Sequence, residues 1–163
     1  MKKILLIVIM LLTLPLSAWA TAQMPDKLIY EGKTVDIHSE PLEQYFNKNH
    51  PKPFSMMQPT CTALWRGYLA TWEIKKDKLY LVKVVGGGCG DDEPEVPISK
   101  LFPGKSSPIF ANWYSGTLVV PQGKMLSYEH MGYEQVYEKE LRIRISKGKV
   151  VGKKTIDNRK KKK

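Results

Sequence analysis

Hydrophobic and polar residues alternate most clearly between Cys61 and Val85, and this stretch predicts the central β-hairpin of the fold. The apolar residues of one parity in its first half are Leu64, Tyr68, Ala70, Trp72 and Ile74. A polar turn centred on Lys76-Asp77 interrupts the stretch, and Asp tolerates the left-handed conformation that tight turns use. The pairs expected from this turn are Ile74 with Leu79, Trp72 with Leu81 and Tyr68 with Val85. One face of the hairpin is then almost continuously apolar, and it begins at Arg66.

Shorter elements precede the central hairpin. Residues 27–36 alternate around Gly32 and predict a small hairpin. Residues 38–46 predict a short amphipathic helix, because Leu42, Tyr45 and Phe46 follow the i, i+3, i+4 spacing of one helix face. The prolines after it predict an extended connector over residues 50–60.

A loop, a helical turn and a second hairpin are expected after the central hairpin. Residues 86–97 (GGGCGDDEPEVP) have the composition of a loop, and residues 98–102 predict one helical turn. Pro121-Gln122-Gly123 fits a three-residue hairpin loop with Gly123 in the left-handed position. The pairs expected from that loop are Val120 with Lys124, Leu118 with Leu126, Gly116 with Tyr128 and Tyr114 with His130.

The C-terminal part alternates again and completes the expected sheet. Over residues 136–145, the side chains of Leu141, Ile143 and Ile145 share the inward parity. A turn then leads to a last strand over residues 149–156, in which Ile145 faces either Lys149 or Val150. The pattern predicts a mainly β fold, an antiparallel meander of about 6–8 strands with one short N-terminal helix. Such a meander would form a curved sheet or a partly open barrel.

The first 22 residues are predicted to be a signal peptide that is cleaved after Ala20 or Ala22. Two lysines precede an apolar run from Ile4 to Leu14, and Ala18-Trp19-Ala20 has the small-x-small pattern of a cleavage site. The run is shorter than the roughly 20 residues of a membrane span, so no transmembrane span is expected after cleavage. We therefore expect export to the bacterial periplasm or beyond, a single β-rich domain over residues 23–157, and a disordered basic tail over residues 158–163.

The net charge of +10 is concentrated near the two ends of the chain. Two lysines leave with the signal peptide, and residues 153–163 carry six net positive charges, which leaves +2 for the body. A nearly neutral body is not the basic surface of a nucleic-acid-binding protein, so no nucleic-acid partner is expected. The tail lysines favour a weak contact with an anionic surface; they are Lys160, Lys161, Lys162 and Lys163.

The two cysteines, Cys61 and Cys89, are predicted to form a disulfide. Disulfides persist in exported proteins, and the register of the central hairpin places Cys61 opposite position 92, about three residues from Cys89. The glycine-rich loop around Cys89 is flexible enough to close that gap.

Residues for catalysis or metal binding are scarce. The three histidines, His38, His50 and His130, lie in separate elements without the spacing of a zinc site. The candidates for acid–base catalysis are His130 with Glu129 and Glu134. The candidates for calcium binding are Asp91, Asp92, Glu93 and Glu95, although their spacing lacks the D-x-D-x-D-G pattern. No cofactor is expected.

Aromatic residues give the stronger indication of function. Trp65 shares the less apolar parity of its strand, and Trp113-Tyr114 begins a strand after a Pro/Ser-rich loop. An exposed Trp near a strand end suits a protein hot spot or a sugar platform. The predicted binding residues are therefore Trp65, Arg66, Trp113 and Tyr114. The sequence favours an exported, non-catalytic binding protein for a protein partner in the cell envelope, of the inhibitor or immunity type. An envelope glycan-binding module is the alternative, and a small hydrolase around His130 is the second alternative.

Overall fold

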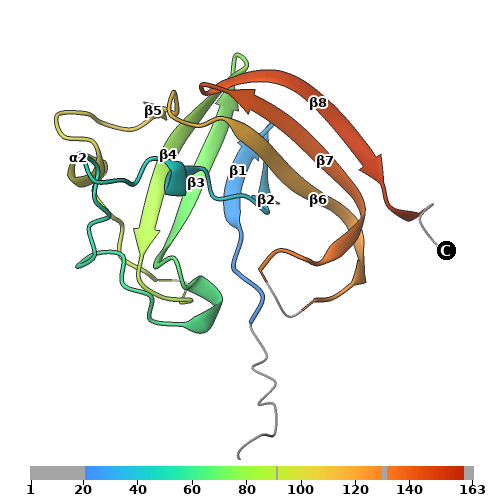
Figure 1. Cartoon of the computed structure of the whole chain (residues 1–163), viewed down its shortest axis with the longest axis horizontal. Helices are drawn as coiled ribbons and strands as arrows, with labels where there is room; N and C mark the ends of the chain where they lie inside the picture. Colours follow the sequence, from blue (N-terminus) through green and yellow to red (C-terminus); the bar gives the residue numbers. More distant parts are fainter. Residues whose placement is uncertain (1–20, 91, 130–131, 160–163) are drawn as a thin grey trace, which may run out of the picture.

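Eight β-strands form one mixed sheet in the computed structural model, which describes residues 21–90, 92–129 and 132–159 (Figure 1). The strands are β1 (Asp26–Tyr30), β2 (Lys33–Ile37), β3 (Tyr68–Lys75), β4 (Lys78–Gly86), β5 (Ile109–Phe110), β6 (Gly116–Ser127), β7 (Val136–Ser146) and β8 (Lys149–Asp157). Their order is β2-β1-β3-β4-β8-β7-β6, with β5 paired to β4. Within the described residues, three short helices lie in the connections: η1 (Pro41–Gln44), η2 (Thr62–Leu64) and α2 (Ile98–Leu101). The mainly β fold that the alternation predicted is confirmed.

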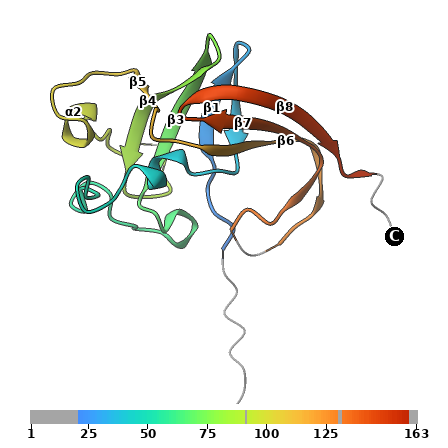
Figure 2. The same ribbon diagram turned by 45° about the horizontal axis from the view of Figure 1, so that its top comes forward.

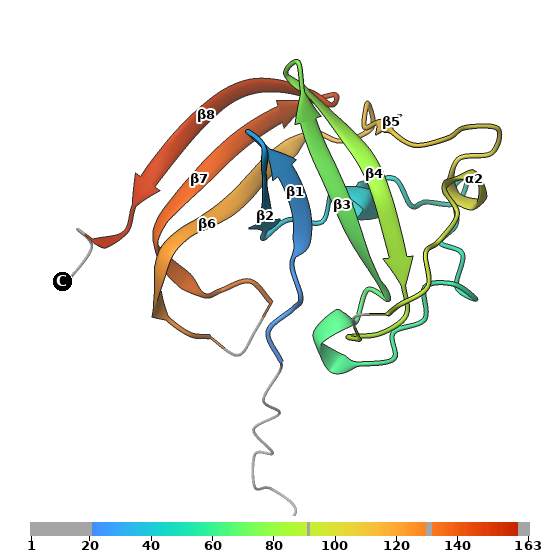
Figure 3. The same cartoon turned by 180° about the vertical axis from the view of Figure 1, so that it is seen from behind.

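The sheet curls strongly but is not closed (Figures 1 and 3). Strands β4 and β8 pair at a single position, Lys78 with Lys149, so the two halves of the sheet meet at a corner. At the opposite corner, just beyond β2, the His38 N–H donates to Val119 O of β6 at 2.8 Å. Figure 2 shows β6, β7 and β8 extending away from β3 and β4, on the side opposite α2.

The hydrophobic core lies between these two halves. Its fully buried side chains include Leu28, Ile37, Trp72, Leu118 and Ile143, which come from five different strands. Because successive strand residues point to opposite faces, each strand contributes every second side chain to this interior. The inward parity predicted for β7 is confirmed, since Ile143 and Ile145 are buried and Leu141 packs against the core.

The two hairpins predicted in the N-terminal half are confirmed. Ile74 pairs with Leu79 and Trp72 pairs with Leu81, around a turn in which Lys76 and Asp77 have φ of 50° and 52°. A bulge between Thr71 and Trp72 shifts the register, so Tyr68 faces Gly86 rather than the expected Val85. β1 and β2 form the small hairpin around Glu31-Gly32.

The hairpin predicted at Pro121-Gln122-Gly123 is wrong. β6 continues through these residues and pairs with β7, with Leu118 opposite Ile143 and Val120 opposite Leu141. Gly123 does have φ of +78°, but it lies at a register shift within the strand rather than in a turn. β6 is the last strand in the sheet order, and an edge strand accommodates Pro because the missing N–H can face away from the partner strand.

Two further details differ from the sequence-based expectation, and a third settles an alternative that the sequence left open. β1 runs parallel to β3, so the sheet is mixed rather than an all-antiparallel meander. The reason is that the long connection after β2 returns the chain to the far side of β1, so β3 pairs with β1 instead of with β2. The helix expected over residues 38–46 is one 3-10 turn, η1, without a side-chain cap. Ile145 faces Val150, which resolves the register of the last strand.

Candidate functional site

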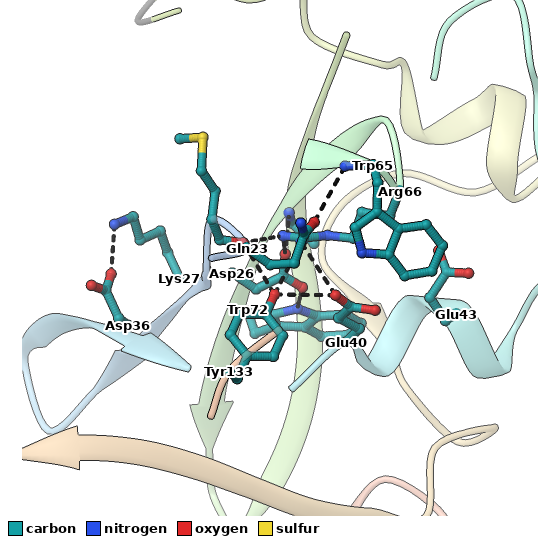
Figure 4. Close-up of polar contacts among 12 residues, drawn as sticks. Gln23, Asp26, Lys27, Asp36, Glu40, Glu43, Trp65, Arg66, Trp72 and Tyr133 are labelled. Atoms are coloured by element: carbon teal, nitrogen blue, oxygen red, sulfur yellow. Dashed lines mark hydrogen bonds and ion pairs between the residues drawn. The ribbon is translucent and has the colours of Figure 1, made fainter. Parts of the chain in front are cut away.

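A buried arginine lies just before the start of β3. Arg66 follows η2, is 1% exposed, and donates through Nη2 to Asp26 Oδ1 at 2.8 Å and to Met24 O at 2.8 Å (Figure 4). Its Nη1 donates to Tyr133 Oη at 3.0 Å and to Glu40 Oε1 at 3.3 Å. We call Asp26, Glu40, Arg66, Trp72 and Tyr133 the Arg66 network.

Asp26 is the buried anion of this network. Its Oδ1 accepts from the Ala70 N–H at 3.0 Å in addition to Arg66, and its Oδ2 accepts from Trp72 Nε1 at 3.0 Å. Burial raises the pKa of Asp26, and the positive charge of Arg66 and these two donors oppose the increase. A buried charge is tolerated when it is paired and hydrogen-bonded, and here both conditions are met.

Tyr133 closes the network from the loop after β6. Its hydroxyl lies 3.1 Å from both Met24 O and Glu40 Oε1, and burial raises its pKa well above the usual value. His38 stacks on the Tyr133 ring at a centroid distance of 5.0 Å, and burial lowers the pKa of His38. The network thus joins the N-terminal segment, the start of η1, β3 and the loop before β7 at one point.

Trp65 projects outward directly beside this anchor. Its side chain is 60% exposed, whereas its N–H donates to Gln23 Oε1 at 3.2 Å. The Gln23 amide in turn donates to Thr62 O at 3.0 Å, and Lys52 donates to Arg66 O at 3.3 Å. The backbone that carries the indole is therefore fixed on both sides, while the ring itself faces solvent.

The Cys61–Cys89 disulfide ties the same region together, and the pairing predicted from the hairpin register is confirmed, with a Cα–Cα distance of 6.1 Å. Next to it, the Thr60 N–H donates to Gly87 O and the Gly87 N–H donates to Gly67 O. Gly67 has φ of +75°, and a Cβ there would lie 2.0 Å from Met57 O, so only glycine allows this close packing.

Two more exposed apolar side chains belong to these loops. Phe54 is 65% exposed and Met56 is also exposed, on a turn in which the Met56 N–H donates to Pro53 O and the Met57 N–H donates to Phe54 O. Met57 itself is buried beneath the turn, against Gly67. We call the exposed side chains of Phe54, Met56 and Trp65 the Trp65 face; their loops lie at the lower end of the molecule in Figure 3.

Acidic side chains border this end of the molecule. Asp92 and Glu95 are exposed, and Glu95 lies 3.7 Å from Lys83, whereas Glu93 accepts from the Gly90 N–H at 3.1 Å. Asp91 lies outside the described residues. Across the part of the chain that the structure describes, no three His, Cys, Asp or Glu side chains gather closely enough to hold a metal ion.

The other predicted binding residues lie elsewhere. Tyr114 is buried in the core, and this burial raises its pKa to about 12. Trp113 is half-buried, donates through Nε1 to Pro41 O at 3.2 Å and stacks on Phe102 at 5.2 Å. Its neighbourhood forms a cavity of about 310 Å³ whose lining includes Tyr45, Phe102, Lys105, Asn112 and Trp113. The structure therefore does not bring Trp65 and Trp113 together.

The acid–base candidates are only partly described. His130 lies outside the described residues, and Glu129 and Glu134 are exposed. Glu129 accepts from Ser127 Oγ at 3.4 Å. The catalytic hypothesis therefore stays a prediction.

Sequence reasoning missed Asp26, Glu40 and Tyr133 as partners of Arg66. A signal for the first was present, because Arg66 shares the parity of buried Tyr68 and Trp72, and Asp26 shares the parity of buried Leu28. Opposite charges on the inward faces of two strands indicate a buried ion pair. Nothing comparable marks Tyr133, whose loop reaches the network only through tertiary structure.

The described residues include no helix that is long and apolar enough to cross a membrane. No protein-family model matches the chain, and neither the curated proteins nor the solved structures include a match to it.

Proposed function

We propose that this is an exported, non-catalytic binding protein that recognises a protein partner in the cell envelope through the Trp65 face. The observation that carries the proposal is the contrast between two adjacent residues: Trp65 is 60% exposed, and Arg66 is 1% exposed and held by four hydrogen bonds. A large apolar ring is thus presented to solvent on a backbone that is fixed from below.

This arrangement has the properties of a binding hot spot. Tryptophan is enriched among residues that dominate the energy of protein interfaces. Fixing the backbone before binding lowers the ordering cost that association must overcome. The disulfide and the glycine-mediated packing of the loops supply that rigidity here.

The acidic border indicates the charge of the partner. Asp92 is exposed beside the loops of the Trp65 face, as is Glu95, which Lys83 neutralises in part at 3.7 Å. Charge complementarity at an interface rim accelerates association and favours the correct partner. A partner with a basic surface therefore fits best. A cationic target protein, bound by an inhibitor or immunity-type protein, would have such a surface.

The test compares two exposed apolar side chains at different places. Immobilised oxidised protein, its Trp65→Ala variant and its Val151→Ala variant are incubated with envelope extract from the source organism, and the retained proteins are quantified by mass spectrometry. Val151 is 48% exposed and lies outside the Trp65 face. Loss of a Trp anchor costs about 2 kcal/mol or more, roughly a 30-fold loss of affinity. The proposal requires a partner that is lost with Trp65→Ala and retained with Val151→Ala. Equal retention by all three proteins contradicts it.

A glycan-binding module is the second candidate, and the aromatic cavity beside Trp113 favours it. Several polar groups in that cavity already have partners within the protein: Tyr45 donates to Leu101 O, and the Gln44 amide bonds the backbone of Ser115. Asn112 and Lys105 are the lining side chains best placed to contact a sugar. Sedimentation with purified cell wall that is reduced by Asn112→Ala but unchanged by Trp65→Ala would select this function over the first.

Export is part of the proposal. The disulfide supports it, because such bonds persist in oxidising compartments. Cell fractionation and N-terminal sequencing of the mature protein test it, with a start at Thr21 or Gln23 as the expected result.

The hydrolase alternative predicts turnover that His130→Ala abolishes.

A further inference from the structure

The outer face of β6, β7 and β8 contains a groove that is separate from the Trp65 face. Register places Arg142 opposite both Val119 and Lys154, and places Arg144 opposite both Thr117 and Gly152, so these side chains share one face of the sheet. They line a hollow of about 490 Å³. A second hollow shares Arg142 and is lined also by Leu126 and Val136. We call the two together the outer groove; its strands are at the upper left in Figure 3.

Cations without an acidic partner dominate the first part of the outer groove. Among the described residues, neither Arg144 nor Lys154 has a carboxylate within ion-pair distance, whereas Arg142 pairs with Glu140 at 2.8 Å. Arg142 and Lys154 are paired on adjacent strands, which lie about 4.8 Å apart, and Arg144 is two residues from Arg142 on the same face of β7, about 6.6 Å along the strand. The three long side chains therefore start close enough to surround one oxyanion.

Gly152 leaves space for the Arg144 guanidinium, because it has no side chain on this face of β8. A Cβ at this position would lie 3.3 Å from Arg144 Nη2, so the guanidinium lies directly across the glycine. With no side chain at position 152, the planar guanidinium can present its N–H groups outward along the groove, as in bidentate recognition of phosphate.

Apolar side chains in the second part of the outer groove point to the type of anion. Leu126 is 50% exposed and Val136 is 36% exposed, next to Arg142 and Arg159. These two arginines are ion-paired with Glu140 at 2.8 Å and Asp157 at 2.6 Å, so the unpaired positive charge of the outer groove comes from Arg144 and Lys154. Cations beside exposed apolar side chains are typical of surfaces that lie on anionic bilayers, where the cations meet headgroups and the apolar groups enter the interface. A free phosphate ion would leave Leu126 and Val136 without a role. The sequence also continues from Arg159 into four lysines, which add charge of the same sign.

We propose that the outer groove binds the phosphate headgroups of an anionic lipid bilayer, with Arg142, Arg144 and Lys154 as the headgroup ligands and Leu126 and Val136 at the lipid interface. This goes beyond recognition of a protein partner. Because the outer groove and the Trp65 face are built from different strands and loops, a membrane-bound molecule could still present Trp65 to a partner.

The experiment is co-sedimentation of the oxidised mature protein with vesicles of phosphatidylglycerol and phosphatidylcholine, compared with phosphatidylcholine alone. We expect binding to the anionic vesicles only, and at least a tenfold weaker partition for Arg144→Glu/Lys154→Glu. The matched control is Lys75→Glu/Lys76→Glu, which makes the same charge change in the exposed β3–β4 turn and should lose much less. Arg144→Gln/Lys154→Gln should give an intermediate loss.

Two further arms identify the ligand. Leu126→Ser/Val136→Ser should weaken vesicle binding without changing the binding of soluble polyphosphate. A variant that ends at Arg159 should keep a measurable part of the vesicle binding. Equal loss in the turn control, complete loss on removal of the four lysines, or displacement of the protein from vesicles by low-millimolar inorganic phosphate would each overturn the proposal. Trp65→Ala should leave vesicle binding unchanged, so this test is independent of the partner-binding test.

Discussion

Replacing Arg66 with methionine is the sharpest test of the Arg66 network. The substitution Arg66→Met keeps most of the side-chain volume and removes the positive charge that faces Asp26 at 2.8 Å. Asp26 then remains fully buried, with hydrogen bonds only from the Ala70 N–H and Trp72 Nε1. Because a buried carboxylate has lost its counter-ion, the free energy of unfolding should fall by about 3–5 kcal/mol at pH 7.

The pH dependence gives the cause of this loss. Burial already raises the pKa of Asp26, and removing Arg66 raises it further, so folded Asp26 binds a proton at pH values where the unfolded chain does not. The folded state then carries more protons than the unfolded state, and stability decreases as pH rises above the ordinary carboxyl pKa of about 3.9. Between pH 7 and pH 5 the variant should regain up to about 2.7 kcal/mol.

The control is Arg66→Met combined with Asp26→Asn, because an amide oxygen still accepts from Ala70 and Trp72 but carries no charge. Urea unfolding followed by tryptophan fluorescence measures all three proteins at pH 5 and pH 7. A loss of 3–5 kcal/mol lowers the urea midpoint by about 2 M for a typical m-value. The double variant should be more stable than Arg66→Met at pH 7 and should lack its gain on acidification. A single variant within about 1 kcal/mol of wild type, or one with the pH dependence of the double variant, would refute the reasoning.

Three other predictions concern neighbouring features. Cys61→Ser/Cys89→Ser should lower the free energy of unfolding by about 3–4 kcal/mol in chemical denaturation, because the disulfide closes a loop with a sequence separation of 28 residues. Burial lowers the pKa of His38 in the folded state, against the opposing pull of Asp36 and Glu140, so the unfolded state binds more protons just below the ordinary His pKa of about 6.5. Stability should therefore decline as pH falls through 6.5, and His38→Gln should flatten that part of a thermal-melt pH profile. Trp65→Ala should change the free energy of unfolding, measured by urea denaturation, by no more than about 0.5 kcal/mol, since the Trp65 ring is largely in solvent. A larger loss would mean that the ring stabilises the fold.

The parts of the fold that local sequence specifies were predictable. The Lys76-Asp77 turn and the alternation around it determine the central hairpin, because turn chemistry and side-chain parity act within a few residues. The disulfide followed from that register and from the expected compartment. Pro121-Gln122-Gly123 has an equally local turn signal, yet β7 competes for β6 and buries Leu118 and Val120 against Ile143 and Leu141. Non-local pairing of that kind is not encoded in a short window.

The candidate site was predictable in part for the same reason. Trp65 stood out because it has the less apolar parity of the predicted hairpin, and its ring is exposed just before β3 begins. Arg66 was grouped with it as a binding residue, although it is buried and paired with Asp26, 40 residues earlier in the chain. Tyr133 is 67 residues later than Arg66, and no periodicity links the two. Long-range polar partners emerge only when the strands and loops have been placed in space.

The corner between β4 and β8 has a consequence for the behaviour of the protein in concentrated solution. These strands pair only at Lys78 and Lys149 among the described residues, so most of the outward rim of β8 has backbone groups that a foreign strand could join. Lys149, Lys153 and Lys154 lie along this rim, and positive charge is a common barrier to strand addition. The lysines that make β8 basic would thus prevent the β8 edges of two copies of the protein from pairing and extending into fibrils.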